Sequence, residues 1–217
     1  MKEKIFFSID PVLFTLDENN DLKVLLIEQT QEPFANMMRL PGGVIDLEEH
    51  SSIDQAAYDI LSSKTSLQAS YFEQLKTYGN NSRDPRGWTV STSYIGITDN
   101  YDSTMGWVSV KDIGSMDLAF DHKQIIIDAV DRLKNKVNYS LIPAHFLGQE
   151  FTMSELKKVY EAILEEKIDK SSFIKKMRET NAIEPIEGKF VTGDFRPAQV
   201  WRIKQMHHFN RNLKNKI

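Results

Sequence analysis

The chain has 217 residues, of which 41% are hydrophobic and 27% are charged, and it contains no cysteine. This composition is that of an ordinary water-soluble protein, long enough for two small domains. The lack of cysteine excludes disulfides, thiolate metal sites and a cysteine nucleophile, and it agrees with a reducing compartment. No apolar run approaches the roughly 20 residues of a membrane helix, and Asp10 and Pro11 interrupt the apolar start of the chain. We therefore expect a soluble, cytoplasmic protein.

The distribution of charge divides the chain in two. The first 136 residues contain 13 Lys/Arg and 21 Asp/Glu, whereas the residues from Val137 onward contain 14 and 10. An acidic first part followed by a basic second part is typical of a sensor domain joined to a domain that binds a polyanion. We therefore expect two domains, a sensor domain at 1–136 and a domain that binds a polyanion at 137–217.

Residues 1–136 mix strand-like and helix-like patterns. The runs with strand character are 12–16, 22–28, 71–78, 88–98 and 106–110. Apolar residues recur at helical spacing from Ile53 to Leu61 and again between Asp121 and Lys136. The glycines of the Leu40-Pro41-Gly42-Gly43 segment permit a sharp turn before the first of these helices. Interspersed strands and helices predict a mixed domain, and thus an α+β chain.

Residues 137–217 have a different pattern, in which two helices are followed by two short strands. An amphipathic helix is predicted between Leu156 and Leu164, and a second helix begins after Asp169, a residue type that caps helix N-termini. Strands at 189–192 and 199–203 flank a Gly- and Pro-containing turn. Two helices joined by a short turn and followed by a hairpin predict a winged helix-turn-helix.

Residues 40–67 resemble the Nudix box, in which a Gly-Gly turn precedes a helix whose glutamates hold Mg²⁺ or Mn²⁺. Gly42, Gly43 and Glu49 match that pattern. If two extra residues are allowed after Glu49, the positions that depart from the pattern hold Asp59, Ile60, Ser63, Lys64 and Ser66. Lys64 places a positive charge at a metal-ligand position, so we expect no catalytic metal and no hydrolase activity. The alternative is that the segment is merely a turn and an amphipathic helix.

The loop from Gly79 to Trp88 carries Arg83 and Arg86 beside the tryptophan. Arginine matches pairs of phosphate oxygens, and an aromatic ring can stack on a base. The loop is therefore a candidate for binding a phosphorylated ligand. The alternative is a solvated hairpin in which Arg83 pairs with Asp84.

Three motifs together resemble the NrtR-type family of Nudix-related transcriptional regulators. They are GNNSRDPRGWTV at 79–90, LAFDH at 118–122 and YSLIP at 139–143. The degraded Nudix box and the following winged helix also match, so the resemblance covers nearly the whole chain. It implies a Nudix-like α/β/α sandwich domain at 1–136 that senses an effector, followed by a winged helix-turn-helix domain at 137–217 that binds DNA.

The resemblance implies a homodimeric repressor of NAD-biosynthesis genes that binds ADP-ribose or a related nucleotide as an effector and needs no cofactor. The effector would face Arg83 and Arg86, with Trp88 and Asn81 from the same loop and Arg39 before the glycine turn as further candidates. Asp121 and His122 belong to a family motif, and we expect them to cap the helix that follows.

Three alternatives stay open. The first is a sugar effector, since related proteins of the same architecture respond to sugars such as arabinose. The second is an active Nudix hydrolase, which would need its metal held by Glu48, Glu49 or another loop carboxylate. The third is a dimerisation scaffold that binds no small molecule.

The second helix of the winged helix is predicted to contact DNA. If Phe173, Ile174 and Met177 point inward, helical geometry places other side chains on or beside the outer face. These are Ser171, Ser172, Lys175, Lys176 and Arg178. Lysines can neutralise phosphates, and serines let a helix enter the major groove. The alternative is a solvated cationic surface.

The wing and the dimer complete the predicted DNA interface. Lys189 and Arg196 of the wing hairpin would contact phosphate or the minor groove. A dimer would place two recognition helices about one turn apart on palindromic double-stranded operator DNA.

Overall fold

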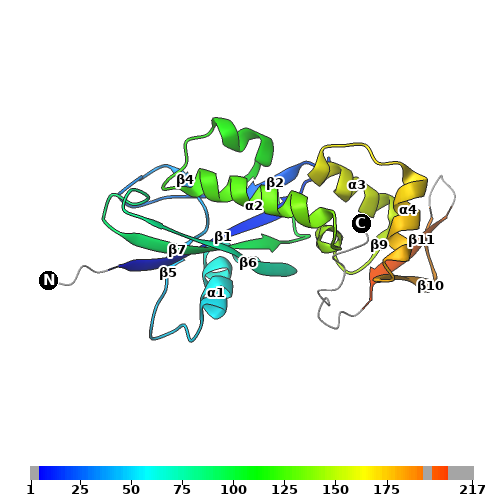
Figure 1. The fold of residues 1–217 in the computed structure, drawn as a ribbon, viewed down its shortest axis with the longest axis horizontal. Coiled ribbons are helices and arrows are strands. Elements are labelled where there is room, and N and C mark those ends of the chain that lie inside the picture. The colour runs from blue at the N-terminus through cyan, green and yellow to red at the C-terminus, as the bar shows by residue number, and fades with distance from the viewer. Residues whose placement is uncertain (1–4, 193–196, 205–217) are drawn as a thin grey trace. The chain divides into compact units, whose positions relative to one another are not determined.

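The computed structural model describes residues 5–192 and 197–204, and the chain forms two compact units (Figure 1). The first unit runs to Asp17 and from Leu22 to Arg132, and the second contains Glu18–Asp21 and the chain from Leu133 onward. The division falls within helix α2 (His122–Val137), slightly before the boundary that the sequence suggested. The first unit mixes strands and helices, as the α+β prediction requires.

A six-stranded mixed sheet forms the centre of the first unit, with strand order β6-β7-β1-β2-β8 and β5 paired to β1. Its strands are β1 (Phe6–Leu16), β2 (Leu22–Leu25), β5 (Gly43–Val44), β6 (Tyr71–Asn80), β7 (Thr89–Ile97) and β8 (Trp107–Ser109). β1 and β7 pair in parallel, whereas β1 pairs antiparallel with β2. Two short strands, β3 (Ile27–Glu28) and β4 (Met38–Arg39), form a separate ribbon, and a 3₁₀ helix, η1 (Val110–Ser115), follows β8.

Helices α1 (Ile53–Thr65) and α2 lie on opposite faces of this sheet (Figure 1). Ile9 of β1 packs against Ala56 and Ile60 of α1. Because successive strand residues point to opposite faces, the next residue, Asp10, points toward α2, where it meets His122. The predicted α/β/α sandwich is confirmed.

Strand β1 is longer than the apolar run at 12–16 that predicted it. It begins at Phe6 and includes Asp10 and Pro11, and it pairs with β7 from Phe6 to Phe14. A buried carboxylate is tolerated in a central strand only when it is paired. Asp10 has such a partner in Arg83, which lies too far along the sequence for strand periodicity to reveal.

The second unit is a winged helix-turn-helix. Its elements are η2 (Ile142–Leu147), β9 (Phe151–Thr152), α3 (Met153–Leu164), α4 (Lys170–Glu179), β10 (Ile183–Val191) and β11 (Ala198–Ile203). Thr152 and Glu155 form a capping box at the start of α3. The Asp169 side chain accepts from the Ser172 N–H and caps α4 as predicted. The wing strand β10 begins six positions before the predicted strand, because the hairpin pairs from Ile183 with Ile203.

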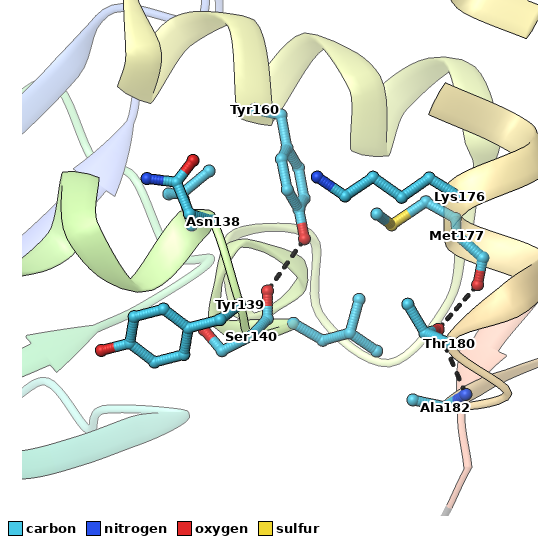
Figure 2. Close-up of a pocket in the computed structure, with 10 residues that line it drawn as sticks. Asn138, Tyr139, Ser140, Tyr160, Lys176, Met177, Thr180 and Ala182 are labelled. Atoms are coloured by element: carbon cyan, nitrogen blue, oxygen red, sulfur yellow. Dashed lines mark hydrogen bonds between the residues drawn. The ribbon is translucent and has the colours of Figure 1, made fainter. Parts of the chain in front are cut away.

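Tyr160 of α3 joins the helix pair to the segment that follows α2 (Figure 2). Its hydroxyl donates to the Ser140 carbonyl at 3.0 Å, and its ring packs edge-on against Phe173 of α4 with centroids 5.1 Å apart. Burial raises the pKa of Tyr160, so the hydroxyl stays protonated and remains a donor.

We expect Tyr160→Phe to lower the free energy of unfolding by about 1 kcal/mol, because the Ser140 carbonyl loses this donor. Urea denaturation measures the difference. Tyr139→Phe is the matched control, since the Tyr139 side chain lines the same small cavity but is 46% exposed. Equal losses in the two variants would contradict the assignment.

Candidate functional site

A cavity of about 360 Å³ opens in the first unit beside the Gly42-Gly43 turn. Its walls come from β1, the glycine turn, the end of α1, the 79–88 loop and the start of α2. This volume lies in the range of small-molecule sites, which is a few hundred to about 1,000 Å³. The lining is strongly polar and contains four Lys or Arg side chains and two carboxylates.

Arg83 forms the buried base of the cavity. Its guanidinium donates twice to the Asp121 carboxylate, at 3.0 and 2.8 Å, and once to Thr89 Oγ1 at 3.2 Å. A further ion pair of 3.3 Å joins it to Asp10. The side chain is buried, so these contacts fix its position. The hairpin alternative required an ion pair between Arg83 and Asp84. Instead, the Asp84 carboxylate forms its ion pair with Arg86, at 2.7 Å.

Asp10 and His122 continue the network below Arg83. His122 Nδ1 accepts from the Leu40 N–H at 2.9 Å, and its Nε2 lies 3.5 Å from Asp10 Oδ1. Ser91 donates a short hydrogen bond to the same carboxylate. Burial alone would raise the pKa of Asp10, but His122, Ser91 and Arg83 together outweigh it and lower that pKa to about 2. The side chains of Asp121 and His122 thus hold the cavity wall in place through Arg83 and Leu40. The sequence had favoured a role for them in capping the helix that follows.

The low pKa of Asp10 predicts a loss of stability in acid. A carboxylate with a lowered pKa in the folded state stabilises the fold above its unfolded pKa, which is about 3.9. We expect about 2 kcal/mol of the free energy of unfolding to disappear as the pH falls from about 5 toward 2. Urea denaturation at several pH values tests this.

Asp10→Asn provides the comparison for that measurement. The variant cannot ionise at this position, so it should lack this part of the acid dependence while being less stable than the wild type at pH 7. Superimposable pH profiles for the two proteins would show that the Asp10 carboxylate does not supply it.

Arg39 and Arg86 are the more accessible arginines of the cavity. Arg39 Nη1 donates to the carbonyls of Leu40 and Gly42 at 3.0 and 2.9 Å. Arg86 is 56% exposed at its side chain, pairs with Asp84, and lies 5.9 Å from the centroid of the Phe120 ring. The cavity therefore offers guanidinium groups next to an aromatic ring, which suits a phosphate joined to a base.

The structure brings together Arg39, Arg83 and Arg86 of the predicted effector residues. Trp88 and Asn81 are not among the side chains that line the cavity: Trp88 is 44% exposed and lies against Gly79, and Asn81 is exposed on the loop. The aromatic ring in the cavity is Phe120, which sequence reasoning missed. It belongs to the 118–122 motif, so a signal was present, although no spacing rule linked it to the arginine loop.

The Nudix-box positions have distinct environments. Ser63 Oγ donates to the Ile60 carbonyl within α1 at 3.1 Å, whereas Lys64 lines the cavity. Glu48 and Glu49 are exposed and do not line it. Within residues 5–192 and 197–204, no cluster of three or more His, Asp or Glu side chains has an arrangement that could hold a metal ion.

A second candidate site is the outer surface of α4. All five side chains predicted for it are exposed: Ser171, Ser172, Lys175, Lys176 and Arg178. Phe173 and Met177 are buried on the opposite side, as helical spacing requires. The Arg178 guanidinium lies 5.6 Å from the centroid of the Trp201 ring of β11. A dense cationic helix surface of this kind can neutralise a polyanion.

Of the two predicted wing residues, the structure describes only Lys189. Lys189 is exposed on β10 and forms an ion pair with Glu150. Arg196 lies outside the described residues.

None of the described helices is long and apolar enough to cross a bilayer.

Comparison with known proteins agrees with both units. The family model of the NrtR DNA-binding winged helix domain matches residues 143–203. The "ADPR responsive transcriptional repressor NtrR" of Acinetobacter baylyi is 32% identical over 212 residues, which cover 94% of this chain and 84% of that protein.

Solved structures give the same result. Shewanella oneidensis NrtR, complexed with a 27mer DNA, matches with a TM-score of 0.83 and 36% identity over 91% of this chain and 93% of that one. The Nudix domain of the same protein, complexed with ADP ribose, matches with a TM-score of 0.56 and 38% identity over 60% of this chain and 90% of that one. With its Nudix-like sandwich followed by a winged helix, the chain belongs to the NrtR-type family of Nudix-related transcriptional regulators.

Proposed function

We propose that the protein is a DNA-binding transcriptional repressor that ADP-ribose releases from its operator. The first unit would bind the effector without hydrolysing it, and the second would bind palindromic double-stranded DNA as part of a homodimer. The resemblance of the sequence motifs suggests genes of NAD metabolism as targets. Relatives over nearly the full chain support this proposal, because one is named for its response to ADPR and another is complexed with DNA.

The observation that carries the effector proposal is the cationic cavity. Arg39, Lys64 and Arg86 surround a space beside Phe120 in a unit that resembles a domain complexed with ADP ribose. Guanidinium and ammonium groups suit the diphosphate of this ligand, and the aromatic ring suits its adenine. Arg83 is held by two carboxylates. We therefore propose that Arg83 mainly shapes the floor of the cavity and contributes less than the other cations to binding the ligand.

The coupling to DNA requires that the effector bind one conformation better than another. Arg83 and the Asp121-His122 pair connect the cavity to the first residues of α2. We propose that a ligand bound in this cavity changes these contacts and thereby the conformational preference of the dimer. A ligand-bound protein that holds its operator as tightly as the free protein would contradict this mechanism.

The competing proposal is that the protein is an enzyme, a Nudix pyrophosphohydrolase. Lys64 stands where the pattern requires a metal-binding glutamate, and the exposed Glu48 and Glu49 lie outside the cavity lining. A cation at this position disfavours a bound Mg²⁺ by direct repulsion. A sugar effector is disfavoured by the number of cations in the cavity, since a neutral sugar offers them no countercharge.

Calorimetric titration with ADP-ribose, with and without Mg²⁺, tests the proposal, and arabinose and NAD serve as comparison ligands. We expect metal-independent binding of ADP-ribose with no AMP produced. Fluorescence anisotropy with labelled operator DNA should then show release as ADP-ribose is added. Hydrolysis of ADP-ribose that depends on Mg²⁺ would support the hydrolase function. Binding of arabinose but not of ADP-ribose would show that the effector is a sugar.

A further inference from the structure

Lys64 occupies a defined place at the edge of the cavity. It lies on α1 one turn after Ile60, so the two side chains share a face of the helix. The side chain of Ile60 packs against Gly43, where an added Cβ atom would lie 3.4 Å from Ile60 Cγ2. This contact fixes the face of α1 that is turned to the glycine turn. Lys64 consequently lines the cavity together with Gly42 and Gly43.

The charges of the cavity are unequally paired. Of its four cations, Arg83 has Asp10 and Asp121 as ion-pair partners and Arg86 has Asp84. Among the residues that the structure describes, Arg39 and Lys64 have no carboxylate within salt-bridge distance. Two positive charges therefore remain without an ion-pair partner in this part of the protein.

Arg39 supplies an independent sign that the cavity is built for an anion. Its Nε is buried and has no hydrogen-bond partner among the described residues. Burial also lowers the pKa of Arg39 from its ordinary value, although the charge of Asp10 opposes this. A buried donor without an acceptor is unfavourable, and an anion bound beside the Arg39 guanidinium would offset the cost of burying its charge.

We infer that Lys64, together with Arg39, binds the diphosphate of the nucleotide effector and takes the electrostatic place of the divalent cation in a Nudix hydrolase. This inference rests on the proposed function, because it assigns residues within the same cavity. A diphosphate diester carries one negative charge on each phosphate, which matches the two unpaired cations. Lys64, which stands in place of a metal-binding glutamate of the Nudix box, thus provides a metal-independent binding site for the diphosphate.

Lys64→Met tests the inference, since it removes the ammonium group and keeps the length of the side chain. We expect the affinity for ADP-ribose, measured by calorimetry without divalent metal, to fall by roughly ten- to a hundredfold. Lys64→Arg should retain the affinity within about threefold, because the charge is kept. The affinity for adenosine, which lacks phosphate, should not change in either variant.

Lys123→Met is the matched control, because Lys123 is a lysine of the same unit that does not line the cavity. It should bind ADP-ribose like the wild type. The Lys64 variants should keep the thermal midpoint of the wild type, since Lys64 is exposed on the helix surface. Unchanged ADP-ribose affinity in Lys64→Met would overturn the inference and leave the proposed function intact.

Inorganic pyrophosphate separates the inference from the choice of effector. If the wild type binds pyrophosphate but not ADP-ribose, and Lys64→Met loses pyrophosphate binding, the role of Lys64 is supported and the effector must be another diphosphate. If the wild type binds neither compound, both the effector proposal and the role of Lys64 are overturned.

Discussion

Gly42→Ala is expected to abolish the response to the effector and to destabilise the first unit. A Cβ atom at this position would lie 1.9 Å from Asp10 Oδ1 and 2.8 Å from the Ile9 carbonyl oxygen, so the backbone itself blocks it. The Asp10 carboxylate would have to leave its contacts with Arg83 and His122. We expect a loss of about 2–3 kcal/mol in the free energy of unfolding. Urea denaturation and titration with ADP-ribose measure the two effects.

Gly114→Ala is the appropriate control for this substitution. Nothing lies within 4 Å of a Cβ atom built at Gly114, which belongs to the 3₁₀ helix after β8. The control should therefore keep both the stability and the ligand affinity of the wild type within about 0.5 kcal/mol. A Gly42→Ala protein that binds ADP-ribose with wild-type affinity would show that the Asp10 network does not shape the binding site.

The double variant Lys175→Gln/Lys176→Gln is expected to weaken operator binding by roughly a hundredfold at low salt. Both side chains are exposed on α4, and each lysine that neutralises a phosphate releases counterions from DNA. The dependence of log affinity on log salt should become shallower by about one for each phosphate that the variant no longer neutralises. Fluorescence anisotropy over a series of salt concentrations gives both quantities.

The two single variants separate the contributions. Lys176 also lines the small cavity beside Tyr160 and Met177 (Figure 2), so part of its stem packs on the helix pair. We therefore expect Lys175→Gln to have the larger effect on the salt dependence. Lys123→Gln, in the other unit, should change neither affinity nor slope. Salt slopes identical to the wild type in the double variant would remove α4 from the DNA interface.

Local sequence patterns determined the elements that depend on local rules. Helical spacing predicted α1, α3 and α4, and the residue type at Asp169 located the start of α4. The same periodicity placed Phe173 inside and Lys175 outside, because adjacent residues of a helix are separated by about 100°. The boundaries of the strands were less accurate, as β1 shows, since a charged residue in a buried strand is explained only by its distant partner.

The candidate site depended on tertiary interactions that no local pattern contains. Arg83 was identified from the sequence, but its ion pairs with Asp10 and Asp121 were not, and they change it from an exposed ligand-binding residue into a buried support. Phe120, rather than Trp88, is the aromatic ring of the cavity. The position of Lys64 was predicted from the Nudix-box pattern, whereas its place in the cavity follows from the packing of Ile60 on Gly43.

The sequence by itself determined the order of the two domains, the departures from the Nudix box and the cationic surface of α4, because each is written in residues close together along the chain. Only the tertiary structure decided which charges are neutralised and which stay available. That outcome depends on the parallel pairing of β1 with β7, which brings Asp10 beside Ser91, and on the start of α2, which places His122 against Asp10. Side-chain periodicity describes one element at a time, whereas ion pairing in a buried site is set by segments that meet only when the sheet and its helices are assembled.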